Sequence, residues 1–185
     1  MINNVNTDWG VNSTYTGIQI ASMSYGSLGG GPLLPGDQGD NGSSAEANLV
    51  NQATEAGIVC VVAIGNDGTN RVPSPGSADG AITIGSVNDN NSVLRTDDKM
   101  SDFSNYGPRI SDNDDDDLDE QKPDVTSYGS NIMSATYAAS FGLPGTGVTL
   151  ADDQYDSKSG TSLATPIASG VIALILEADP TLTPE

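Results

Sequence analysis

The chain has 185 residues, a length typical of one domain, and carries 25 acidic against 6 basic side chains, for a formal net charge of -19 at pH 7. This charge would repel nucleic-acid phosphates and anionic membrane surfaces, which excludes both as expected partners, although it offers oxygen ligands for calcium. The longest apolar stretches, residues 58–64 and 171–176, are too short to span a bilayer, and the polar first residues lack a signal-peptide pattern.

The first predicted elements are a strand, a helix and a second strand. Residues 17–24 and 57–64 are apolar and rich in β-branched side chains, which predicts strands, and residues 43–56 repeat apolar positions at helical spacing. Ser43 or Ser44 offers an ordinary helix start. This order predicts a right-handed parallel crossover.

Three further strands are expected along the chain, and together with the crossover they indicate an α/β fold. They are predicted at residues 80–87, 125–128 and 132–137, the last two continuing the same sheet. The single cysteine, Cys60, lies in the second strand of the chain, where a small buried thiol is expected rather than a catalytic or metal-binding one.

The last predicted element is a helix over residues 161–178. Its apolar residues lie on nearly every face, which indicates a place in the interior of the protein. It should stop at Asp179–Pro180, and Thr183 followed by Pro184 is a new helix start, so we expect the domain to continue beyond the chain.

Residues 159–170, SGTSLATPIASG, place Ser162 at the N-terminus of this last helix. Unpaired N–H groups and the helix dipole favour the negative charge that develops on an attacked carbonyl at such a place. Taken alone, the serine could equally cap a core helix.

Residues 61–68, VVAIGNDG, place Asn66 directly after a buried strand, where its neutral amide could donate to a developing oxyanion. The same letters also suit an ordinary turn. Two other segments stand out, IASMSYG at residues 20–26 and DFSNYGP at residues 102–108, the latter followed by KPDV at 122–125.

In this order the four motifs resemble those of the subtilisin-like serine peptidases (subtilases, peptidase family S8), and the resemblance covers most of the chain from about Gly17. It implies that Ser162 is the nucleophile and Asn66 the oxyanion donor, and that an extended substrate pairs with the main chain of the 20–26 strand. The substrate-binding residues it implies are Ser24, Tyr25, Gly26 and Gly65.

The resemblance implies a three-layer subtilisin-like α/β fold with a mostly parallel sheet and a buried central helix starting at the nucleophile. The chain contains no histidine, and the family's aspartate and histidine segments would lie upstream of Met1. We therefore expect residues 1–185 to be a partial catalytic domain, incomplete at both ends, which lacks the Asp/His region and a C-terminal helix. Alone it should be inactive.

The acidic run at residues 111–120 suggests a metal site. Carboxylates at Asp112, Asp114 and Asp116, with Glu120 beyond, have the alternate spacing of calcium loops, although an EF-hand glycine is missing. A solvated acidic loop is the alternative. No cofactor is required for the expected chemistry, so calcium here would be structural.

The function implied by the resemblance is peptide-bond hydrolysis through a Ser162 acyl-enzyme, by a secreted or cell-surface endopeptidase. Expected partners are a peptide or protein substrate and the protein's own propeptide. Two alternatives remain open at this point: a non-catalytic subtilase-like module that binds extended peptides, and an acidic calcium-binding surface protein.

Overall fold

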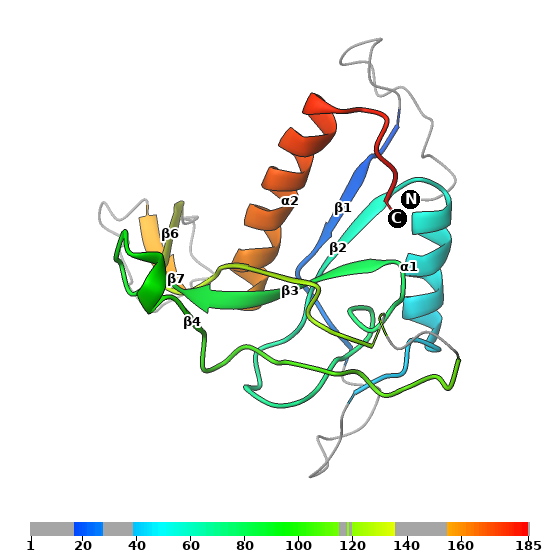
Figure 1. Ribbon diagram of the computed structural model, residues 1–185, viewed down its shortest axis with the longest axis horizontal. Coiled ribbons are helices and arrows are strands. Elements are labelled where there is room, and N and C mark those ends of the chain that lie inside the picture. The colour runs from blue at the N-terminus through cyan, green and yellow to red at the C-terminus, as the bar shows by residue number, and fades with distance from the viewer. Residues whose placement is uncertain (1–16, 28–38, 115–117, 119, 136–154, 185) are drawn as a thin grey trace, which may run out of the picture.

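In the computed structural model, a five-stranded sheet lies between two helices, which gives three layers (Figure 1). The structure describes residues 17–27, 39–114, 118, 120–135 and 155–184. This α/β architecture is the one that the alternation of patterns in the sequence predicts. The elements of the main sheet and its helices are β1 (Ile20–Met23), α1 (Ala45–Glu55), β2 (Val59–Ala63), β3 (Ala81–Asn88), β4 (Lys99–Met100), β5 (Val125–Tyr128) and α2 (Thr161–Ala178).

Four strands of the main sheet are parallel neighbours, in the order β1, β2, β3 and β5. Strand β4 pairs antiparallel with the end of β3. In the register of the first pair, Ile20 lies opposite Val59 and Met23 opposite Val62. The carboxyl ends of β1 and β2 therefore meet at the same edge of the sheet, which brings the loops that follow them together.

Strand β2 forms the centre of the core, and all five of its residues are buried. Both of its faces are covered, which is why its sequence is continuously apolar rather than alternating. Cys60 and Val62 face α1, whereas Val59 and Val61 face α2. The prediction of a buried Cys60 is confirmed, and burial raises the pKa of this thiol.

Helix α1 begins where the sequence predicts it. Ser44 is the N-cap, and its Oγ accepts a hydrogen bond from Ala47 N at 3.2 Å. The helix ends before Gly57, whose φ of +88° turns the chain into β2 in a conformation that favours glycine.

Helix α2 has the predicted bounds and packs on the sheet through small residues. Ala164, Thr165 and Ala168 are buried on that side. The prediction that every side of this helix is buried is wrong for its outer side. There, Val171 and Leu174 are 52% and 66% exposed. By length and composition alone α2 could cross a membrane, but its inner side contacts four strands of the sheet, which is the placement of a core helix.

The prediction for residues 132–137 is wrong about their partner. Strand β6 (Ile132–Ala135) does not continue the main sheet but pairs antiparallel with β7 (Tyr155–Lys158) in a separate two-stranded sheet. Positions 136 and 137 lie outside the described residues. The sequence pattern of a short strand indicates an extended conformation but does not indicate which strand it pairs with. The separate sheet of β6 and β7 could therefore not be predicted from the sequence.

Candidate active site

Ser162 lies in the first turn of α2, half-buried at the carboxyl edge of the sheet. The N-cap residue, Gly160, has no side chain of its own to cap the helix N-terminus. Ser24, directly after β1, donates from Oγ to the carbonyl of Ser162 at 2.9 Å. Among the described residues, the Ser162 hydroxyl makes only a long contact of 3.5 Å, to the carbonyl of Ser24.

Asn66 reaches the same place from the loop after β2. Its Oδ1 accepts from Thr161 N at 2.8 Å and from Thr161 Oγ1 at 3.0 Å. These two bonds assign the side-chain oxygen of Asn66 to Thr161 and leave its NH₂ group as a donor for another partner. Within the described residues that NH₂ group donates to no protein atom. It is a neutral, oriented hydrogen-bond donor next to a serine.

These residues line one cavity of about 280 Å³. The structure brings together all six residues that the sequence predicts for nucleophile, donor and substrate binding, since Ser24, Tyr25, Gly26, Gly65, Asn66 and Ser162 all line it. A larger cavity of about 470 Å³ lies between the starts of β1 and β2 and the end of α2, and it contains none of them. The predicted site residues therefore lie together at the smaller cavity.

Five further residues line this cavity that the sequence did not predict for the site: Ala63, Asp67, Arg71, Pro73 and Thr161. The Arg71 side chain is 3% exposed, and its Nη1 lies 3.3 Å from Asp67 Oδ2. Asp67 stands next to Asn66 in the motif, but nothing in the local sequence indicates that an arginine in a turn-rich segment is buried beside the site.

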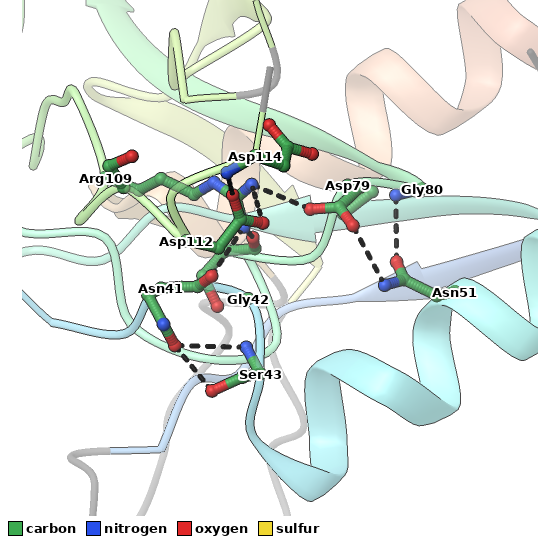
Figure 2. Close-up of polar contacts among 12 residues, drawn as sticks. Asn41, Gly42, Ser43, Asn51, Asp79, Gly80, Arg109, Asp112 and Asp114 are labelled. Carbon is green, nitrogen blue, oxygen red and sulfur yellow. Dashed lines mark hydrogen bonds and ion pairs between the residues drawn. The ribbon is translucent and has the colours of Figure 1, made fainter. Parts of the chain in front are cut away.

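Asp112 and Asp114 of the acidic run lie elsewhere, near the buried guanidinium of Arg109 (Figure 2). Its Nη2 contacts Asp79 at 2.8 Å and Asp112 at 3.1 Å, and its Nη1 donates to the carbonyl of Asn41. Asp112 Oδ1 also accepts from Asp114 N at 3.3 Å. Asp112 is therefore already neutralised by a cation of the protein itself.

The other residues predicted to bind calcium are less informative. Glu120 is buried, and Asp116 lies outside the described residues. Among the residues that the structure describes, no three acidic or cysteine side chains gather as metal ligands.

The fold is α/β, and one cavity at the carboxyl edge of its sheet is lined by a serine at a helix N-terminus and by an asparagine amide. The subtilase family model matches residues 5–185, and the chain belongs to the subtilase family. Serine protease AprX of Bacillus subtilis is 37% identical over 91% of this chain and 36% of its own length. The alkaline elastase YaB of a Bacillus species is 30% identical over 93% of this chain and 32% of its own.

Solved structures show the same fold. Sphericase superposes with a TM-score of 0.63 at 25% identity, over 91% of this chain and 46% of that one. The S41 psychrophilic protease gives a TM-score of 0.59 at 23% identity, over 89% and 45%, and shows the fold alone. The predicted subtilisin-like fold is confirmed. The chain spans about a third of the length of the curated relatives just named.

Proposed function

We propose that this chain is the part of a subtilisin-like serine endopeptidase that carries the nucleophile, the oxyanion donor and the substrate-binding strand. Ser162 is the nucleophile, and a histidine and an aspartate outside these 185 residues complete the triad. The observation that carries the proposal is the convergence of Ser162, Asn66 and Ser24 on one cavity, from three segments far apart in the chain.

In this mechanism an extended peptide pairs with the main chain of residues 24–26, and its scissile carbonyl lies between Ser162 Oγ and the Asn66 amide. Ser162 Oγ attacks the carbonyl carbon while its proton passes to the histidine. The carbonyl electron pair moves onto oxygen, where Asn66 Nδ2 donates a hydrogen bond to it. Collapse of this intermediate expels the amine, which takes the proton, and water then hydrolyses the acyl-enzyme.

No residue of the described chain supplies the base. The chain contains no histidine, and the two charged side chains that line the cavity, Asp67 and Arg71, are paired with each other. An imidazole is therefore the group that the site lacks for proton transfer near neutral pH.

The remaining parts of the proposal concern location and ions. We propose a secreted or cell-surface enzyme, supported by relatives such as the halolysin-like extracellular serine protease Nep of Natrialba magadii, 31% identical over 69% of this chain and 17% of its own length.

The substrate is a peptide or protein, and a propeptide of the same protein would bind the same strand. A calcium ion in the acidic loop would serve stability only.

The test uses an extended protein, in which this chain is joined to a segment that supplies the proposed histidine and aspartate. Ser162→Ala should abolish peptide cleavage and labelling by a fluorophosphonate, because both need this hydroxyl. Ser157→Ala, an exposed serine of β7, is the matched control and should retain both.

Labelling that survives Ser162→Ala would remove this residue from the role of nucleophile. An extended wild-type protein that binds peptides but cleaves none would instead support the peptide-binding module.

A further inference from the structure

Asn105 lies in the loop after β4 and is completely buried, beneath the segment that carries Asn66. Its backbone N–H donates to the carbonyl of Gly65 at 3.0 Å. An amide with no exposed surface must have its polar atoms satisfied by the protein, so the partners of this side chain define what it holds in place.

Those partners flank Asn66 on both sides. Asn105 Nδ2 donates to the carbonyl of Ile64 at 3.3 Å, before Asn66, and to Asp67 Oδ2 at 3.2 Å, after it. Asn105 Oδ1 accepts from Asp67 N at 2.7 Å, and a longer contact of 3.5 Å reaches Thr69 N. One side chain therefore holds the main chain immediately before and after the proposed oxyanion donor.

The contact between Asn105 and this loop leaves no room for a side chain at position 65. A Cβ built on Gly65 would lie 2.5 Å from Asn105 Nδ2, and the φ of Gly65 is +111°. The close approach and the backbone conformation both require glycine here. The main chain at Gly65 therefore packs directly against the side-chain amide of Asn105.

We propose that Asn105 is a positioning residue for the oxyanion hole. Thr161 fixes the side-chain oxygen of Asn66, and Asn105 fixes the main chain from which that side chain projects. Together they set where the NH₂ group points, which decides whether it meets the oxygen of the transition state. The inference rests on the proposed function of Ser162 and Asn66.

The test is a double-mutant cycle in the extended protein, with kcat and KM measured for Asn66→Ala, Asn105→Ala and the double variant. Loss of an oxyanion donor lowers kcat about 10²–10³-fold in subtilisin, so Asn66→Ala should do the same. Asn105→Ala should lower kcat about 10-fold, a part of that loss, with KM changed less than about 2-fold. In the Asn66→Ala background, Asn105→Ala should have no further effect on kcat.

The matched control is Asn70→Ala. Asn70 also ties its loop to the segment after Asn105, through Nδ2 to the carbonyl of Gly107 at 3.2 Å, but it makes no hydrogen bond to residues 64–67. The Asn70→Ala variant should have a lower free energy of unfolding than the wild type but an unchanged kcat. If Asn105→Ala does not fold, Asn105→Ser takes its place, because it removes the donors to Ile64 and Asp67 without placing a second carboxylate beside Asp67.

Three results would overturn the inference. An equal fall in kcat from Asn105→Ala in the wild-type and Asn66→Ala backgrounds would show that Asn105 acts independently of the donor. An unchanged kcat for Asn105→Ala, when Asn66→Ala is slow, would show that the loop keeps its geometry without this amide. An unchanged kcat for Asn66→Ala would refute the oxyanion role itself, and the positioning role with it.

Discussion

At the scale of single residues, the buried guanidinium of Arg109 joins segments that are far apart in the sequence (Figure 2). It donates to the carbonyls of Asn41 and Ser77 and pairs with Asp79 and Asp112. A planar group with five N–H donors suits such a junction, because it can serve several acceptors at once. In a chain of net charge -19, it also offsets local repulsion among carboxylates.

We expect Arg109→Gln to destabilise the protein by about 2 kcal/mol, because the two carboxylates lose their buried partner while remaining partly hydrated. The same variant tests calcium binding by the acidic loop. Without the guanidinium, millimolar calcium should raise the melting temperature by more than it does in the wild type, since the cation no longer competes with Arg109 for Asp112.

The measurement is thermal unfolding with and without calcium, with Lys99→Gln as an exposed control. Replacing Asp112, Asp114 and Asp116 with asparagine should remove any calcium response. A response of equal size in all these variants would place the ion outside the acidic loop.

How much of the site the sequence predicts depends on whether a residue belongs to a local pattern. Ser162 and Asn66 stand at the start of an apolar helix and at the end of an apolar strand, so both positions are visible in the sequence. Arg71 and Asn105 lie in irregular loops, and their importance comes from contacts with distant segments. No local pattern indicates such contacts.

At the scale of elements, strands flanked by turns are well predicted because burial on both faces leaves a continuous apolar run. Strand β2 is the clearest case. The strands β4 and β7 are missed because they are short and exposed, so their sequences, KM and YDSK, carry no periodic signal. Helix α2 is found from its composition, but composition does not show that one side faces solvent.

The outer side of α2 leads to a prediction about association. Leu174 is 66% exposed beside the half-exposed Val171 and Ile175, and a contiguous apolar surface of this kind promotes self-association. We expect the 185-residue chain to form oligomers or aggregates, and Leu174→Gln to reduce them while changing the unfolding free energy by less than about 0.5 kcal/mol.

Size-exclusion chromatography with light scattering measures this effect. Leu94→Gln, which changes a similarly exposed leucine far from α2, is the control and should leave the association unchanged. Equal association of the wild type and Leu174→Gln would show that a different surface is responsible.

At the scale of the whole molecule, the described core brings Ser162 and Asn66 together, but the chain contains no histidine to serve as the general base. We therefore expect residues 1–185, purified alone, to cleave neither casein nor chromogenic peptides. Under the proposed function, adding in trans a segment that carries the proposed histidine and aspartate should restore cleavage that serine-protease inhibitors block. Robust cleavage by the isolated chain would show that another residue serves as the base.

The hydrogen bonds that assemble the site also have a consequence for folding. Asn66 and Thr161 are 95 positions apart, and Ser24 and Ser162 are 138 apart, so these contacts close long loops and are entropically costly until the sheet exists. The site should then be among the last features to form. A slip of one residue between β1 and β2 would turn every β1 side chain to the opposite face of the sheet, and Ser24 could no longer meet Ser162. The geometry around Ser162 therefore depends on the correct register between β1 and β2.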